Sequence, residues 1–404
     1  MANDTLKVGN KISGTSIKGY VTFIIILMLF LTIFLNYKEV ILLLKGEVVS
    51  HMKLETPYFI KMLKDVLIIM LISLLSLRFL IYRVLCKRRQ AILMLFLIVL
   101  GCGSMIYSAS YSSNYLLILF GLRWIFPILL VVLLIGIVDD NMQIKIASYI
   151  VPVFLVGFFL QVIELIFAKN WFGHNQLGLN LRNPGFYLIP ISMSFFSAIT
   201  MYYTYHFYKG KRRTTLLTME ALSIIIANSG TGFFVLALFV VSVIAKKIKP
   251  KVWALVLSLL IIFLLIGLLP KITNRADIYE SFFLRAGSVT QEIKPEYFLL
   301  SKDFGKATAT ALLFSYNVSK DETPYFVADS MISSVVVNLG IFFLIIFIAL
   351  VISVSDSSLK SAHFIMVFMI FALANNLFEV FPSNILFSVN MAYFIYKQNQ
   401  QVAV

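Results

Sequence analysis

The chain has 404 residues, of which 60% are hydrophobic and only 13% are charged, and its mean hydropathy is +0.93. These values exclude an ordinary soluble domain, in which about 25% of residues are charged, and they indicate a polytopic membrane protein. The formal net charge of +15 does not indicate nucleic-acid binding. The basic residues lie in short clusters between apolar segments, where they act as topology signals and contact anionic lipid headgroups.

The first apolar segment has no small-residue cleavage site after it, so we expect a retained transmembrane span rather than a signal peptide. Further along the chain, Cys86 and Cys102 lie on different segments without the spacing of metal ligands. The sequence therefore predicts neither a disulfide framework nor a zinc site. We expect no metal and no cofactor.

The apolar segments predict the helices, because a membrane span needs roughly 20 mostly apolar residues. The expected spans are 19–36, 62–82, 91–109, 115–138, 145–168, 186–208, 214–228, 230–246, 251–269, 331–354, 361–376 and 383–397. The predicted fold is an all-α membrane protein of about twelve transmembrane helices.

The loops between these spans predict the topology. Four basic clusters fall on one side of the predicted membrane: Lys7/Lys11/Lys18, Arg83/Lys87/Arg88/Arg89, Lys209/Lys211/Arg212/Arg213 and Lys246/Lys247/Lys249/Lys251. The positive-inside rule makes that side cytoplasmic. Both termini are therefore predicted to be cytoplasmic, and the alternate loops face outward.

One outward loop, 270–330, is much longer than the others and lies between the ninth and tenth spans. It divides the chain into a first membrane part (1–269), the loop itself and a last membrane part (331–404). Loops of this length are usually functional or disordered. The many aromatic residues of this loop argue against disorder, so we expect a folded cap outside the membrane.

Arginine at membrane depth costs about 2.5–3.5 kcal/mol on insertion scales, so each instance needs a reason. Arg123, in FGLRWIFP, lies near the outer end of a predicted span. It is either an anchor at the lipid interface or an anion contact within the bundle. Arg182, in the segment RNPGF, lies at the outer mouth of another span, where Gly185 allows close approach of the backbone.

Two arginines of the long loop, Arg275 and Arg285, repeat this outward position. The planar guanidinium group suits phosphate oxygens and stays charged at physiological pH. Three outward arginines predict a diphosphate held by side chains. The alternative is ordinary ion pairing with Asp277 or Glu280.

Asp329 lies where the long loop re-enters the membrane, in VADSMISSVVVNLG. Its carboxylate could cap the helix that follows, alone or together with Ser330. It could equally accept a proton as a general base. The residue type alone favours the cap.

Five segments in this order resemble the O-antigen polymerase and ligase superfamily, and within it the Wzy-type polymerases of capsule and O-antigen. They are RNPGF, IIANSGTGFFVLALFV, NRADIY, DFGKATA and ADSMISSVVVNLGIFFL. The resemblance covers roughly residues 115–350. Each motif is short and degenerate, so the specificity lies in the ordered set.

The resemblance implies that Arg182, together with Arg275 or Arg285, binds a lipid diphosphate. Asp329 stands eleven residues before Gly340, at the position that a histidine occupies in the ligases, and this departure favours a polymerase. The implied catalytic residues are therefore Asp329, Arg275 and Arg182. The implied substrate contacts are Arg285, Arg123, Tyr279, Ser229 and Gly185.

The function that the resemblance implies is polymerisation of polyprenyl-diphosphate-linked oligosaccharide repeat units, on the outer face of a bacterial cytoplasmic membrane. An acceptor hydroxyl would attack the anomeric carbon and the diphosphate would leave, without metal or nucleotide. The implied partners are the lipid-linked glycan, membrane lipids, a chain-length regulator and a flippase. Alternatives are a ligase-like glycan transferase, a lipid-linked oligosaccharide flippase or other transporter, and a non-catalytic assembly scaffold.

Overall fold

The computed structural model describes residues 2–45, 55–81, 88–111, 115–167, 183, 185–187, 189–245, 295–306, 308, 330–355 and 358–402. Within these ranges every regular element is a helix and none is a strand. The prediction of an all-α fold is confirmed for this part of the chain.

The α-helices are α1 (Ala2–Phe34), α2 (Tyr37–Leu44), α3 (Tyr58–Ile81), α4 (Arg88–Tyr111), α5 (Tyr115–Leu134), α6 (Asp140–Phe167), α7 (Pro190–Phe207), α8 (Gly210–Ala227), α9 (Gly230–Ala245), α13 (Met331–Leu339), α14 (Ile341–Ser355), α15 (Leu359–Ala374) and α16 (Ser383–Val402). Two short 3₁₀ helices, η2 (Gly185–Tyr187) and η3 (Pro295–Tyr297), complete the elements of the described ranges.

Every predicted span coincides with helical structure, except 251–269, which lies outside the described residues. Within the part of the chain that the structure describes, four segments are long and apolar enough to cross a membrane: Ile17–Leu42, Arg89–Tyr111, Leu117–Leu134 and Asp140–Ile166. The count of twelve spans stays a prediction. Helix α2 was not predicted and lies in the expected outer loop 37–61.

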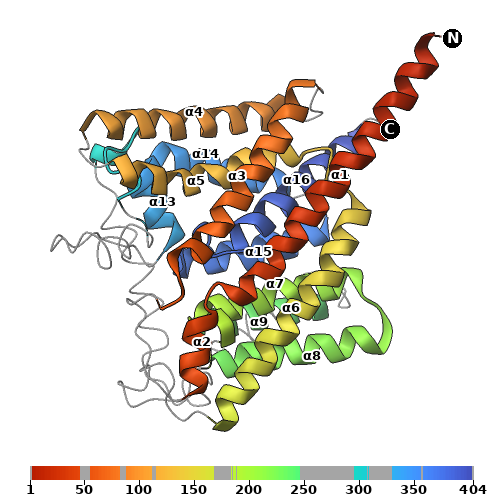
Figure 1. Ribbon diagram of the computed structural model, residues 1–404, viewed down its shortest axis with the longest axis vertical. Coiled ribbons are helices and arrows are strands. Elements are labelled where there is room, and N and C mark those ends of the chain that lie inside the picture. The colour runs from red at the N-terminus through yellow and green to blue at the C-terminus, as the bar shows by residue number, and fades with distance from the viewer. Residues whose placement is uncertain are drawn as a thin grey trace.

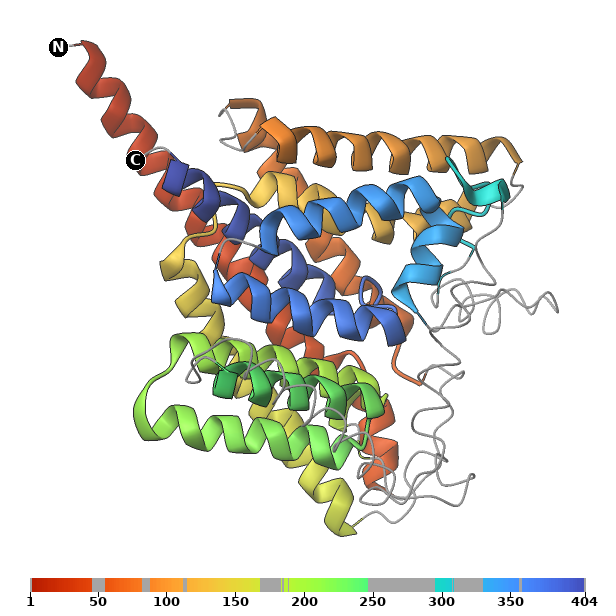
Figure 2. The same ribbon diagram turned by 180° about the vertical axis from the view of Figure 1, so that it is seen from behind.

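Successive long helices run in alternating directions across the bundle (Figure 1). Helices α4, α5 and α14 lie toward one end of its long axis and α7, α8 and α9 toward the other. The start of α1 and the end of α16 lie at the same end of the helices, which the view from behind also shows (Figure 2). This arrangement is the one that an even number of crossings would produce.

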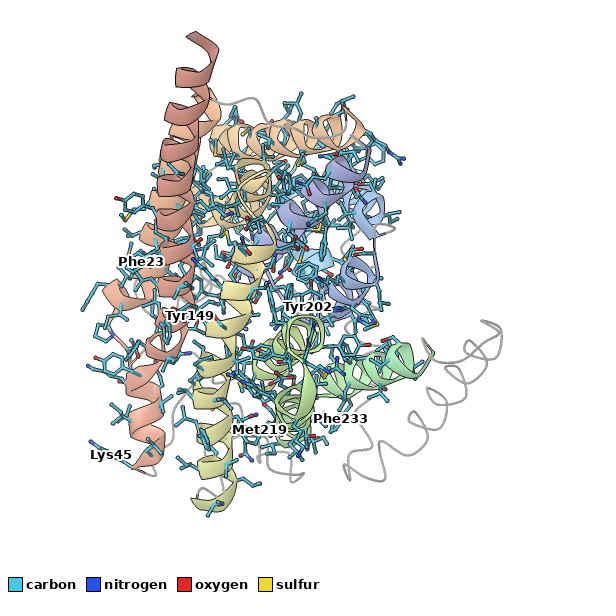
Figure 3. All side chains as sticks on the ribbon, turned by 90° about the vertical axis from the view of Figure 1, so that its right-hand side faces the viewer. Phe23, Lys45, Tyr149, Tyr202, Met219 and Phe233 are labelled. Carbon is cyan, nitrogen blue, oxygen red and sulfur yellow. The ribbon has the colours of Figure 1, made fainter. Side chains whose placement is uncertain are left out.

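Helix α7 is central, since nearly all of its residues from Pro190 to Thr204 are buried. Its neighbours include α6, α8, α9 and α15. Tyr202 of α7 is fully buried, whereas Phe23 of α1 points away from the bundle and is 64% exposed (Figure 3). Large apolar side chains on the outside of a helical bundle are typical of a surface that faces lipid.

The predicted span 331–354 is two helices rather than one, because the chain breaks at Gly340, where φ is +95°. That backbone conformation strongly favours glycine. The carbonyl group of Leu339 accepts a hydrogen bond from Ser104 of α4 at 3.3 Å. The N–H of Phe342 donates to the Phe298 carbonyl at 3.0 Å. Partners from other segments therefore satisfy backbone groups beside the break, which a broken helix inside an apolar bundle requires.

Helix α7 begins at Pro190, four residues later than the predicted start at 186. The residue before it, Ile189, is extended, as the position before a proline prefers. Proline suits the first helical position because its missing N–H would have no intrahelical partner there. The intervening η2 turn holds part of the RNPGF segment.

Candidate functional site

Five of the predicted site residues lie outside the described residues: Arg182, Arg275, Tyr279, Arg285 and Asp329. Their roles stay predictions. The other three predicted residues, Arg123, Gly185 and Ser229, lie within the described part of the chain. They belong to α5, to η2 and to the junction between α8 and α9.

Gly185 begins the η2 turn with φ of +59°. Its N–H donates a hydrogen bond to the buried Glu164 carboxylate of α6 at 3.0 Å. A Cβ at this position would lie 2.8 Å from the Gly157 carbonyl oxygen, so both the conformation and the close approach require glycine. Next to it, Asn183 donates from its N–H to the Ile226 carbonyl of α8 at 3.4 Å. The turn is thereby attached to α6 and α8.

Ser229 is buried between α8 and α9. Its hydroxyl accepts a hydrogen bond from the N–H of Gly232 at 3.4 Å, which satisfies one donor at the start of α9. Asn228 before it has φ of +49° and ends α8 in the left-handed conformation, which asparagine tolerates. These contacts give Ser229 a structural role, and its contact with substrate stays a prediction.

Arg123 contacts a carboxylate of the same chain. Its Nε and one terminal nitrogen donate to the two oxygens of Asp65 at 3.1 and 2.5 Å. The side chains are only 14% and 19% exposed, and the two-pronged geometry is the strong form of such a pair. An anion contact within the bundle was one of the two interpretations of Arg123, and here α3 supplies the anion.

Around this pair lie further charged side chains, which we call the charged cluster: Glu39, Lys61, Lys64, Asp65, Arg123 and Glu379. The ammonium group of Lys61 donates to Glu39 at 2.8 Å, and the Glu39 side chain is almost completely buried. Lys61 also donates to the Asn36 side chain at 3.3 Å. The ion pairs of the cluster among the described residues include Lys61–Glu39 and Arg123–Asp65.

Lys64 is a further cation of the cluster and belongs to neither of those ion pairs. It is half-buried and lies within electrostatic reach of Arg123, Asp65, Glu379 and Lys61. Among the described residues its ammonium group forms no hydrogen bond or ion pair. Lys64 can therefore bind an anion without breaking an existing pair, and Glu379 places a carboxylate nearby that can accept a proton.

Hydrogen bonds connect the charged cluster to the segments that the sequence singled out. Asn36, which accepts from Lys61, donates to the Phe186 carbonyl of η2 at 3.0 Å. In the loop that holds Glu379, Asn375 donates to Ser192 of α7 at 3.4 Å and accepts from the Met331 N–H at 3.2 Å. The cluster, the η2 turn and the starts of α7 and α13 therefore lie at one end of the bundle, which we call the Lys64 end.

The N-cap of α13 is Ser330. Its hydroxyl accepts from the Ile332 N–H at 3.2 Å and donates to the Ala372 carbonyl at 3.3 Å. Of the two residues considered for this cap, the structure assigns the role to Ser330. The contribution of Asp329 to this cap stays a prediction, because Asp329 lies outside the described residues.

The middle of the long predicted loop packs on the bundle through residues 295–306. Phe304 is fully buried beside Gly121, and the Gly305 N–H donates to the Asn338 side chain at 2.8 Å. Burial would raise the pKa of Asp303. Hydrogen bonds from Lys306 at 2.9 Å and Tyr297 at 2.8 Å outweigh that effect and hold the pKa below its ordinary range.

The sequence reasoning missed Lys61, Lys64, Asp65 and Glu379. A signal for two of them was present, because Lys64 and Asp65 fall inside the predicted span 62–82. The cost of a charge in an apolar span, which singled out Arg123, applies to them equally. No pattern in the sequence pairs Asp65 with Arg123, which lies 58 residues away.

Comparison with known protein families, curated proteins and solved structures finds no match for this chain. Within the described ranges no group of three His, Cys, Asp or Glu side chains is placed to hold a metal ion.

Proposed function

We propose that this chain is a membrane glycosyltransferase that polymerises polyprenyl-diphosphate-linked oligosaccharide repeat units. The observation that carries the proposal is Lys64, a half-buried cation outside the ion pairs of the charged cluster. It lies at the same end of the bundle as the η2 turn of RNPGF and the start of α13, two segments that also carry the sequence resemblance. A cation at the end of an apolar bundle suits a substrate with a diphosphate head and a lipid tail.

In the proposed reaction the lipid tail lies along the apolar outside of the helices and the diphosphate lies at Lys64. The predicted arginines, Arg182 with Arg275 or Arg285, complete the anion contacts. An acceptor hydroxyl attacks the anomeric carbon, a new glycosidic bond forms, and the bond from that carbon to the diphosphate oxygen breaks. Fixed cations stabilise the charge that develops on the leaving diphosphate.

The proton of the acceptor hydroxyl goes to a carboxylate. Asp329 is the first candidate, because it stands eleven residues before Gly340, at the position of the ligase histidine in the resemblance. Glu379 is the second candidate, since it lies within electrostatic reach of Lys64. A ligase-like glycan transferase would use the same groups with another acceptor.

A transporter of lipid-linked oligosaccharide is the candidate from a different class. Glu164 and Glu220 are buried within α6 and α8, and ionisable residues inside a bundle often mark a transport path. Their hydrogen bonds, from the Gly185 N–H to Glu164 and from Thr204 to Glu220 at 2.5 Å, give both a structural role instead. In a strain that lacks the gene, a transporter defect would remove outward repeat units, whereas a polymerase defect would leave them as single units.

The direct test is Lys64→Gln, introduced into a strain that lacks the wild-type gene. We expect single repeat units to accumulate and the polymer ladder to disappear, at an unchanged level of protein in the membrane. Lys45→Gln is the matched control, because it removes an exposed lysine near the end of α2. A normal polymer ladder from the Lys64 variant would refute the proposal that Lys64 binds the diphosphate.

We also propose that the Lys64 end faces outward from a bacterial cytoplasmic membrane and that both termini are cytoplasmic. Single cysteines at Ser288 and Ser357, in a background without Cys86 and Cys102, test this topology. An impermeant thiol reagent added to intact cells should label position 288 and not 357. Equal labelling would contradict the predicted number of spans.

A further inference from the structure

The opposite end of α7 contains a pocket of about 360 Å³. We call it the Arg213 pocket, and its lining residues are Tyr205, His206, Arg213, Ser358, Leu359 and Lys360. They come from the end of α7, the first turn of α8 and the start of α15. The connection between α7 and α8, beside this pocket, lies on the right in Figure 1, away from the Lys64 end. The volume falls within the roughly 300–1,000 Å³ of small-molecule sites.

The two cations of the pocket, Arg213 and Lys360, are half-buried. Aromatic rings lie beside both: the Arg213 guanidinium is 5.7 Å from the centre of the Tyr205 ring, and the Lys360 ammonium is 4.6 Å from that of Phe207. Cations held against ring faces keep their charge in place while losing part of their water. The aromatic contacts therefore fix the positions of the two charged groups at the pocket.

No acidic side chain is among the described residues that line the pocket. Asp140 lies within electrostatic reach of Lys360. Its carboxylate already accepts hydrogen bonds from Tyr393, at 2.6 Å, and from Lys397. In the described part of the chain, neither Arg213 nor Lys360 has an ion-pair partner. The pocket thus holds at least two positive charges that no ion pair within the described residues neutralises.

The start of α15 adds donors for an anion. Ser358 and Ser361 form a capping box, which satisfies the N–H groups of these two residues. The N–H groups of Leu359 and Lys360 are in the first turn, where no intrahelical acceptor exists. Such groups, with the positive end of the helix dipole, favour phosphate. Arginine, lysine and a helix start thus converge on one pocket.

We propose that the Arg213 pocket binds a phosphate group. The bound molecule is either an anionic phospholipid, whose headgroup enters between α7, α8 and α15, or a free phosphate compound. This site is separate from the proposed catalytic end, because it lies at the other ends of α7 and α15. Under the predicted topology it faces the cytoplasm, where basic pockets between membrane helices bind lipid headgroups.

The test compares wild type with Arg213→Gln/Lys360→Gln. Lys209→Gln/Lys211→Gln is the matched control, because it removes the same charge from two exposed residues near the pocket. One arm measures thermal unfolding in nanodiscs of phosphatidylcholine with and without phosphatidylglycerol. The other arm measures it in detergent with inorganic phosphate against chloride at equal ionic strength.

We expect phosphatidylglycerol or inorganic phosphate to raise the unfolding temperature of wild type and of the control. The response of the pocket variant should need at least about tenfold more ligand, because two charge-assisted contacts are lost. A response to the lipid alone identifies a headgroup, and a response to inorganic phosphate identifies a free phosphate compound. Equal responses from all three proteins, or no response from wild type, would refute the site.

Discussion

The positively charged side chains near the two ends of helix α7 have different surroundings. At the Lys64 end, Lys61 and Arg123 are paired with Glu39 and Asp65 at short distances, and Lys64 and Glu379 belong to neither pair. At the Arg213 pocket, the cations lie against aromatic rings and no lining residue is acidic. Among the described residues, the charged cluster has equal numbers of acidic and basic side chains, whereas the lining of the Arg213 pocket is basic without an acidic side chain.

This difference follows from where water is available. A charge buried among helices costs several kcal/mol unless it is paired, so the acids of α2 and α3 accompany the cations there. A charge at a half-exposed helix end is solvated and needs no acid from the chain. Lys64 combines partial burial with the absence of a partner among the described residues, which makes it the candidate for a ligand contact within the charged cluster.

The largest expected effect comes from Asp329→Asn. If Asp329 is the general base, we expect the rate of polymer formation to fall by about 100- to 10,000-fold, the usual cost of removing such a group. The measurement is glycan chain length on gels, with the amount of protein in the membrane determined in parallel.

Asp321→Asn is the control, because it changes another aspartate of the same predicted loop. A full-length ladder from a well-inserted Asp329 variant would eliminate that base. Glu379→Gln would then be the variant to examine, and the chemistry would belong to the charged cluster itself.

The next effect concerns the Arg123–Asp65 pair. Asp65→Ala removes the carboxylate that pairs with the buried Arg123 guanidinium, and we expect a loss of about 3–5 kcal/mol in the free energy of unfolding. Arg123→Met with Asp65→Leu should recover most of that loss, since neither charge is then buried. Thermal or denaturant unfolding in detergent measures both.

The exposed pair Lys302–Glu296 supplies the contrast, because its side chains are 46% and 41% exposed. Lys302→Met should change the free energy of unfolding by at most about 1 kcal/mol. If Asp65→Ala and Lys302→Met lowered the free energy of unfolding by equally small amounts, the distinction between buried pairs and exposed charges would be wrong for this bundle.

Gly305→Ala should detach the docked segment 295–306. The added Cβ would lie 1.8 Å from the Leu117 carbonyl oxygen, and φ at this position is +85°. The conformation alone costs about 1–2 kcal/mol for a residue with a side chain. Hydrogen exchange of this segment should accelerate at least tenfold. Gly19→Ala is the control, because a Cβ there meets no atom within 4 Å, and unchanged exchange in the Gly305 variant would contradict the docking.

Much of the helical architecture was predictable, because a span is a local property of about 20 consecutive residues. The break at Gly340 was not predicted, because its hydrogen-bond partners come from α4 and from residues 295–306. The late start of α7 was readable from Pro190, since proline favours the first helical position. Helix α2 is short, so its eight residues give no span signal.

The candidate site was less predictable than the fold. The sequence analysis considered arginines in apolar spans and so identified Arg123. It did not consider Lys64, although both residues fall inside predicted spans. Pairing depends on tertiary contacts, as Asp65 and Arg123 show, and one sequence does not reveal which charges are compensated. The residue type of Asp329 favoured a cap formed by that residue, alone or together with Ser330, and the hydrogen bond from Ile332 shows that Ser330 is a cap.

The smallest expected effect is a dependence of the docked segment on pH. Contacts with Lys306 and Tyr297 hold the pKa of Asp303 below its ordinary value of 3.8. A carboxyl group whose pKa is lower in the folded state stabilises that state above its unfolded pKa, and this contribution is lost as the pH falls through the folded pKa. Protection of residues 295–306 should therefore stay constant from about pH 6 to pH 4 and decline below pH 4. The decline should be a few-fold only, because Asp303 is partly exposed and solvent weakens its interactions. Hydrogen exchange, corrected for its intrinsic dependence on pH, measures this decline, and Asp303→Asn should show lower protection without it. If Asp303→Asn showed the same decline, another group would be responsible for it. The charge of Asp303 would then not control the docking of residues 295–306.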